Sequence, residues 1–234
     1  MNLITDIYPL NEISITIVFG DEISLKLADR IAEFNQALIA SPFSGFLTTI
    51  PAYASITVYY DPIKVYQSNL NGSSCFDKVS TYIRTLKTNT SEKVKQPDKV
   101  IIPVYYGGKF GPDIDLIAAQ ANLSTAEVIQ IHCAASYRVY MIGFVPGFAY
   151  MGGMDKRLST PRRQQPRASV PAGAVGIAGE QTGIYPLDIP GGWQIIGQTP
   201  LKIFDANRPE PALLKAGDEI RFEPITIEQF RTLS

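Results

Sequence analysis

Residues 143–200 read GFVPGFAYMGGMDKRLSTPRRQQPRASVPAGAVGIAGEQTGIYPLDIPGGWQIIGQTP. Glycine and proline interrupt this stretch too often for a long helix to form. Large apolar side chains, among them Phe144, Tyr150 and Ile177, are too frequent for a flexible linker. The stretch therefore predicts short strands joined by tight turns. We interpret it as the working surface of the protein.

Outward from this stretch, the pattern of short strands continues on both sides. Tyr137–Phe144 precedes it and Glu219–Phe222 follows it, and both read as strands. Many short strands separated by Gly/Pro turns are typical of a closed β barrel or a sandwich. The sequence predicts that residues 101–234 form one such domain.

The first hundred residues follow a different pattern. Ile23, Leu27, Ile31, Phe34 and Leu38 lie on one face of a predicted amphipathic helix. Leaving out the first predicted strand, the order of elements up to the strand Val100–Tyr105 is βαββαβ, which is the ferredoxin-like pattern. The sequence predicts an α/β domain over residues 1–100, with a polar loop at 89–98. The overall fold class is α+β.

Composition excludes several classes of protein. A net charge of −1 argues against a broad basic face for nucleic acid. One histidine and two distant cysteines predict neither a disulfide scaffold nor a metal site. No apolar run approaches the roughly 20 residues of a membrane helix, and the first residues do not resemble a signal peptide. We expect a cytoplasmic protein that binds neither membrane nor nucleic acid.

Several side chains are candidates for chemistry, each with a structural alternative. His132 suits proton transfer, although a helix histidine is more often a hydrogen-bonded packing residue. The cluster of Arg157, Arg162, Arg163 and Arg167 suits a phosphate or a carboxylate, or is solvated loop charge. The segment GGKFG at 107–111 lacks the spacing of a phosphate loop and is interpreted as a turn.

Two further turns carry residues that can read a small polar ligand. The first, GEQTGIYP, contains Gln181 and Tyr185, and the second, PGGWQIIG, contains Gln194. Trp193 lies in the second turn and is either an anchor for a partner or a core residue.

Three motifs are specific enough to indicate a family: GFVPGFAYMGG, TPRRQQPRASVPAGAVGIAGEQTGIYP and PGGWQIIGQTP. Together they resemble the KipI-type, or allophanate-hydrolase-subunit-1-like, family, and the resemblance covers nearly the whole chain. It implies an N-terminal α/β domain and a C-terminal cyclophilin-like β barrel. It also implies the site residues: His132, Arg162 and Arg163 as catalytic; Gln181, Tyr185 and Gln194 as substrate-binding; Trp193 and Phe148 as partner interface.

The resemblance further implies the activity of an enzyme component. Family members include the B subunit of an ATP-dependent 5-oxoprolinase, which cleaves 5-oxoproline to L-glutamate together with a larger, KipA-like C subunit and a third, A subunit. The chain is then expected to be inactive alone. Because no P-loop motif is present, ATP binding is expected to be unconventional or to lie mostly on the partner. Two alternatives stay open: an inhibitor of a sensor histidine kinase, and half of a biotin-dependent carboxyltransferase of the urea carboxylase type.

Overall fold

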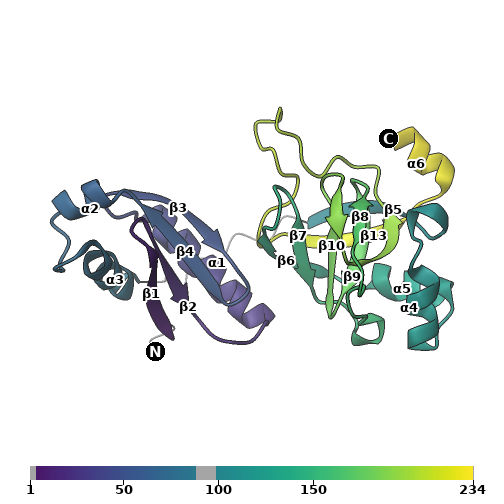
Figure 1. Cartoon of the computed structure of the whole chain (residues 1–234), viewed down its shortest axis with the longest axis horizontal. Helices are drawn as coiled ribbons and strands as arrows, with labels where there is room; N and C mark the ends of the chain where they lie inside the picture. Colours follow the sequence, from purple (N-terminus) through teal and green to yellow (C-terminus); the bar gives the residue numbers. More distant parts are fainter. Residues whose placement is uncertain (1–3, 88–98, 234) are drawn as a thin grey trace. The chain divides into compact units, whose positions relative to one another are not determined.

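The computed structural model describes residues 4–87 and 99–233, and the chain divides into two compact units, Met1–Gln96 and Pro97–Ser234. Figure 1 shows the helices and strands of both units. Each unit has its own hydrophobic core. The segment 89–98, for which a loop is predicted, lies outside the described residues.

The first unit is an antiparallel sheet packed against helices. Its strands, in the sheet order β1-β2-β4-β3, are β1 (Asp6–Asn11), β2 (Ser14–Val18), β4 (Ser55–Tyr60) and β3 (Phe46–Pro51). Its helices are α1 (Leu25–Ala40), α2 (Pro62–Gln67) and α3 (Cys75–Thr85). Alternate strand residues such as Ile15, Ile17 and Val58 point to one face, where they are fully buried against the helices.

Helix α1 shows how the local sequence sets its bounds. The Ser24 hydroxyl accepts a hydrogen bond from the Leu27 N–H and caps the first turn. The predicted apolar face is confirmed for its last four members, Leu27, Ile31, Phe34 and Leu38. Ile23 precedes the helix and is exposed.

The ferredoxin-like arrangement of the first unit is not confirmed. Its last strand is predicted at Val100–Tyr105, but β5 (Lys99–Tyr106) lies in the second unit, parallel to β13 and antiparallel to β12. In the first unit, β1 takes the sheet edge beside β2 instead. Alternation of apolar residues identifies a strand without identifying the strand it pairs with.

Within residues 99–233, seven strands close into a barrel in the order β10-β7-β6-β13-β5-β12-β9 (Figure 1). Besides β5 they are β6 (Tyr137–Ile142), β7 (Ala149–Gly152), β9 (Ala174–Ala178), β10 (Gln181–Ile184), β12 (Gln194–Gln198) and β13 (Glu219–Pro224). The predicted barrel is therefore confirmed. That it is cyclophilin-like stays a prediction.

The remaining elements of the second unit decorate this barrel. They are a two-stranded sheet of β8 (Arg167–Val170) and β11 (Ile189–Gly191), the helices α4 (Ile114–Ala121), α5 (Thr125–Ala134) and α6 (Ile227–Leu233), and the 3-10 turns η1 (Gly108–Phe110) and η2 (Lys156–Leu158). Helix α5 starts at the predicted capping box of Ser124 and Glu127. Helix α4 packs on β12, and α5 packs on β13.

Candidate functional site

Four aromatic side chains gather on the barrel wall, on the side away from its main core. We call Phe148, Tyr150, Tyr185 and Trp193 the aromatic seat. Phe148 is central, with its ring centroid 4.7 Å from Tyr150, 5.2 Å from Tyr185 and 5.3 Å from Trp193. They form the centre of a small cluster that β8 and β11 also cover.

Two glycines allow the indole to lie close against the wall. A Cβ on Gly183 would come within 2.9 Å of the Trp193 ring, and a Cβ on Gly176 would lie 3.1 Å from the Trp193 Cβ. These two positions are paired on adjacent strands, β10 and β9. The glycines of the opening stretch therefore shape a packing surface for the aromatic side chains.

Arg162 lies over this seat. Its guanidinium carbon is 6.0 Å from the Trp193 ring, within reach of a cation–π contact. The backbone on each side is fixed to the Trp193 turn: Gln194 Nε2 donates to the Pro161 carbonyl (3.1 Å), and the Arg163 N–H donates to the Gly192 carbonyl (2.7 Å). Arg162 is exposed and forms no ion pair with a described residue. It is thus a positioned cation that is open to an anion.

The charge of Arg162 also reaches the phenols of the seat. Burial raises the pKa of Tyr150, and Arg162 opposes that rise. Burial likewise raises the pKa of Tyr185. A hydrogen bond with the Trp193 backbone and the charge of Arg162 both act to lower this pKa, but their effect is smaller. Both phenols are neutral near pH 7 and can donate hydrogen bonds.

The next two arginines are held by a buried carboxylate that the sequence did not single out, Asp113. Its Oδ1 pairs with Arg163 (3.2 Å) and Arg167 (2.7 Å), and its Oδ2 accepts the Ile195 N–H (2.6 Å). Arg163 therefore positions the loop and is not free to bind an anion. The sequence signal was weak, because the segment Gly111-Pro112-Asp113 reads as an ordinary turn before α4.

His132 lies inside the barrel with no exposed surface. Its Nδ1 is 2.8 Å from the Tyr106 hydroxyl, and its Nε2 is 3.1 Å from Thr182 Oγ1. Since Thr182 Oγ1 donates to the Gly176 carbonyl, the consistent tautomer carries its proton on Nε2. Burial lowers the pKa of His132 to about 3. A neutral, fully buried ring with both nitrogens satisfied favours the packing alternative over the catalytic role.

This histidine makes stability depend on pH. It is the chain's single histidine, and the unfolded chain protonates it near pH 6.5 while the folded chain does not until about pH 3. Stability is therefore complete above pH 6.5 and falls as the pH drops towards 3. Between pH 8 and pH 5, the free energy of unfolding of the wild type is expected to fall by about 2 kcal/mol more than that of His132→Gln. Urea unfolding, followed by the fluorescence of the single tryptophan, Trp193, measures the free energy of unfolding of the wild type and of the variant at each pH. If the two proteins showed the same dependence on pH, a buried neutral His132 would be excluded.

The other predicted site residues are distributed between the two faces of the wall. Gln181 begins β10 opposite Ala178, which belongs to the cluster of the seat. Gln194 points away from Trp193, because neighbouring strand residues face opposite sides, and its partner Ile177 lies in the main core. Gln194 Oε1 is buried and has no hydrogen-bond partner among residues 4–87 and 99–233.

The predicted interface residues are buried within this chain. Phe148 is 1% exposed and Trp193 is 5% exposed, so neither side chain presents a surface to a partner. Next to the seat, Phe144 is 67% exposed, and its ring lies 5.9 Å from Phe148. Phe144 has a φ of 68°, a conformation that costs a non-glycine residue about 1 kcal/mol. A contact of this region with a partner stays a prediction, and of the two phenylalanines Phe144 has the exposed ring.

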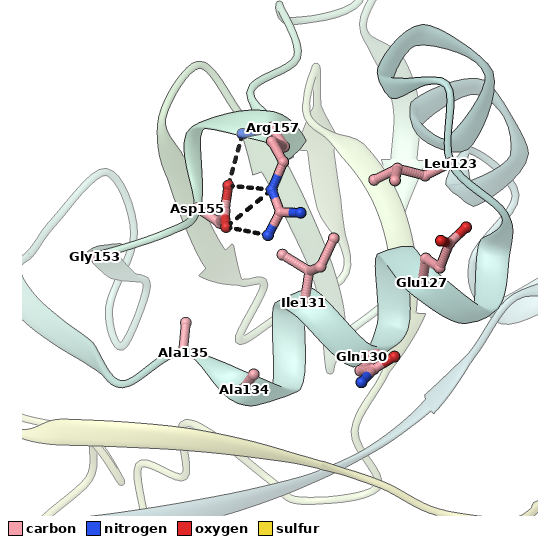
Figure 2. Close-up of a pocket in the computed structure, with 9 residues that line it drawn as sticks. All are labelled: Leu123, Glu127, Gln130, Ile131, Ala134, Ala135, Gly153, Asp155 and Arg157. Carbon is pink, nitrogen blue, oxygen red and sulfur yellow. Dashed lines mark hydrogen bonds and ion pairs between the residues drawn. The ribbon is translucent and has the colours of Figure 1, made fainter.

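A separate hollow of about 590 Å³ lies beside α5 (Figure 2). Glu127, Gln130 and Ile131 line it from the helix, and Asp155 and Arg157 line it from the facing loop. Figure 2 shows the Arg157 guanidinium against the Asp155 carboxylate, with the shortest contact at 2.7 Å. Hydrogen bonds from Arg157 lower the pKa of Asp155 to about 2. Because this pair neutralises itself, none of the described residues that line the hollow is an unpaired cation like Arg162.

Two structural findings concern other classes of site. The described residues contain no group of three or more His, Cys, Asp or Glu side chains that could hold a metal ion. Among residues 4–87 and 99–233, every helix is too short or too polar to cross a bilayer.

Comparison with known proteins places this barrel and its aromatic seat in a family. The family model described as carboxyltransferase domain, subdomain C and D, matches residues 5–214, and the chain belongs to this family.

Within that class, two relatives are similar over almost their whole length. The chain is 43% identical to the B subunit of 5-oxoprolinase from Bacillus subtilis (strain 168), covering 94% of this chain and 93% of the relative. It is 39% identical to the B subunit of 5-oxoprolinase from Escherichia coli O157:H7, covering 93% and 94%. The predicted resemblance to this component of 5-oxoprolinase is confirmed.

A solved structure supports the fold. TTHA0988 matches with a TM-score of 0.77 and 33% identity, covering 91% of this chain. The chain spans 40% of the length of TTHA0988.

Proposed function

We propose that this chain is the B subunit of an ATP-dependent 5-oxoprolinase, which opens 5-oxoproline to L-glutamate while hydrolysing ATP. The observation that carries the proposal is 43% and 39% identity, over more than nine-tenths of each chain, to proteins named as the B subunit of 5-oxoprolinase. The family description names a carboxyltransferase domain, so a carboxyltransferase half stays a prediction, as does a kinase inhibitor. The near full-length relatives favour the oxoprolinase.

The chemistry of this reaction explains the need for ATP. A lactam resists hydrolysis because resonance with its nitrogen makes the carbonyl carbon a weak electrophile. Transfer of the terminal phosphate of ATP to the amide oxygen releases ADP and makes the lactam carbon more electrophilic. Water then adds to this carbon, the ring C–N bond breaks to free the amine, and hydrolysis of the resulting acyl phosphate gives glutamate and inorganic phosphate. Negative charge then gathers on the transferred phosphate, beside the carboxylate of the substrate, and a fixed cation stabilises such charge where water is excluded. In this chain Arg162 has that role, while Arg163 and Arg167 hold its loop through Asp113.

The site is shared with other chains. Arg162 and the neutral Tyr150 phenol lie on an outer wall of the barrel, and such a wall becomes a closed site when a second protein covers it. Exposed Phe144, at the edge of the seat, is a suitable contact for that protein. We assign the cover to the larger, KipA-like C subunit, with a third, A subunit completing the enzyme. Binding of ATP falls mostly to these partners, and this chain is inactive alone.

The proposal is tested by reconstitution. The full chain is mixed with the larger, KipA-like subunit and the third subunit from the same cell, and glutamate formation from 5-oxoproline and ATP is measured. All three together are expected to form glutamate, and mixtures that lack this chain are expected to form none. Equal glutamate formation without this chain would refute the proposal.

A further inference from the structure

A second hollow, of about 490 Å³, lies in the barrel unit where the C-terminal helix meets the end of β5. We call it the α6 hollow. Figure 1 shows α6 beside β5, at the C-terminal end of the chain. The hollow is lined by Tyr105, Gly108, Lys109, Phe110, Ile227, Phe230 and Arg231. Its volume is within the range of small-molecule sites.

Three aromatic rings form one wall of the α6 hollow. The Phe110 and Phe230 centroids are 4.9 Å apart, and Tyr105 lies 5.2 Å from Phe110 and 6.5 Å from Phe230. All three side chains are half-buried, so each ring packs on its neighbours and keeps part of its surface open. Such a wall suits a flat ring, which gains from stacking on aromatic faces.

The charged groups that line the α6 hollow are both cations. Lys109 Nζ lies 5.1 Å from the Phe110 ring centroid, and Arg231 lies on α6 beside Phe230. Neither forms an ion pair with a described residue. Glu228 is one turn earlier on α6; hydrogen bonds at the start of the helix lower its pKa most, and Arg231 adds a smaller effect. Both cations therefore line the hollow together with its aromatic wall, and neither is held in an ion pair by a described residue.

The turn that carries Lys109 is built by glycine. Gly107 and Gly108 have φ values of 75° and 54°, which favour glycine, and a Cβ on Gly108 would meet no atom within 4 Å. This is the GGKFG segment, which is a turn as predicted, with η1 as its continuation. The open space above Gly108 leaves room for a ligand to approach the backbone.

We propose that the α6 hollow binds an adenine nucleotide. The base stacks on the wall of Tyr105, Phe110 and Phe230, and the phosphates lie against Lys109 and Arg231. A bare anion would leave the rings unused, and an uncharged ring would leave the cations unused. The proposal rests on the proposed function in one respect, since ATP is the nucleotide that the reaction consumes. The α6 hollow is then this chain's own share of ATP binding, beside the larger share assigned to the partners.

The test is calorimetric titration of the full chain with ATP, and separately with adenosine and with tripolyphosphate. ATP is expected to bind at least tenfold more tightly than either fragment, because it uses both halves of the hollow. Lys109→Ala and Arg231→Ala are each expected to weaken ATP binding about tenfold, as the loss of one charge-assisted contact would. Both residues are exposed, and unchanged Trp193 fluorescence checks that the variants fold.

Two control variants remove equivalent charges elsewhere. Lys156→Ala and Arg84→Ala alter exposed side chains outside the hollow and are expected to leave ATP binding within twofold of wild type. Three results would each overturn the proposal: no ATP binding by the full chain, wild-type affinity in the Lys109→Ala/Arg231→Ala double variant, or tripolyphosphate binding as tight as that of ATP.

This test is independent of the oxoprolinase assay. The titration contains no 5-oxoproline and no partner protein, so it reports on the hollow alone. If the complete complex forms glutamate while the chain binds no ATP, the nucleotide site is wrong and the proposed function stands. If ATP binds as expected and the complex forms no glutamate, the proposed function fails and the site stands.

Discussion

Replacing Asp113 with alanine is expected to destabilise the barrel unit by about 3 kcal/mol. Asp113 is 5% exposed, and its carboxylate joins Arg163, Arg167 and the Ile195 N–H. Removing it leaves two cations without their anion and a buried N–H without its acceptor. The estimate lies at the low end of the range for buried ion pairs, because Arg163 and Arg167 are 36% and 22% exposed and water reaches them in part. Urea unfolding followed by Trp193 fluorescence measures the loss.

Asp155→Ala is the matched control. Asp155 pairs with Arg157 at the same distance, 2.7 Å, as Asp113 pairs with Arg167, but Arg157 is 62% exposed. Because ion pairs in water contribute little, we expect a loss of at most about 1 kcal/mol. An equal loss of stability in the two variants would show that burial does not determine how much the Asp113 ion pairs contribute to the free energy of unfolding.

Replacing Arg162 with alanine is expected to lower glutamate formation by the complete complex about 100-fold, the usual effect of removing one group that stabilises developing charge. The fold should be unaffected, since Arg162 is exposed and forms no ion pair with the described residues. Arg162→Lys keeps the charge and loses the planar fork, so part of the activity should return. The measurement is kcat and KM for 5-oxoproline and ATP in the reconstituted enzyme.

Arg157→Ala provides the comparison for Arg162. It removes an arginine from the same cluster in the sequence, but one that Asp155 already neutralises. Activity within twofold of wild type is expected. A similar loss in both variants would mean that general charge on these loops, rather than the position of Arg162 over the aromatic seat, supports the reaction.

Local signals in the sequence identified much of the fold. The spacing of Leu27, Ile31 and Phe34 predicted the buried face of α1, and Ser124 with Glu127 marked the start of α5. The density of glycine and proline between 143 and 200 predicted the short strands of the barrel. Each of these features depends on residues near one another in the chain, which a sequence displays directly.

Features that depend on contacts between residues far apart in the chain were harder to predict from the sequence. The strand β5 was identified, but its partners β12 and β13 lie about 90 residues or more further along the chain. Asp113 meets Arg167 across 54 positions, and nothing local marks its carboxylate as a pairing group. His132 was selected for its chemistry, whereas its burial between Tyr106 and Thr182 follows from closure of the barrel.

The seat itself combines both kinds of information. Its residues lie in the motifs that the sequence singled out, and the structure packs Phe148, Tyr185 and Trp193 against one another. In the structure these rings pack against Gly176 and Gly183, and the Trp193 ring lies under the Arg162 guanidinium. We therefore interpret them as the support of Arg162 rather than as contacts for a ligand or a partner. The chain thus presents one positioned cation on a rigid aromatic base.

The most direct measurement is the ratio of products formed by the reconstituted complex. With this chain, its larger partner and the third component present, glutamate and ADP should appear one to one, and both should require 5-oxoproline. Without this chain, neither coupled product should form. Glutamate formed in its absence, or ADP formed at the same rate whether or not 5-oxoproline is present, would contradict the proposal that this chain is part of an ATP-dependent 5-oxoprolinase.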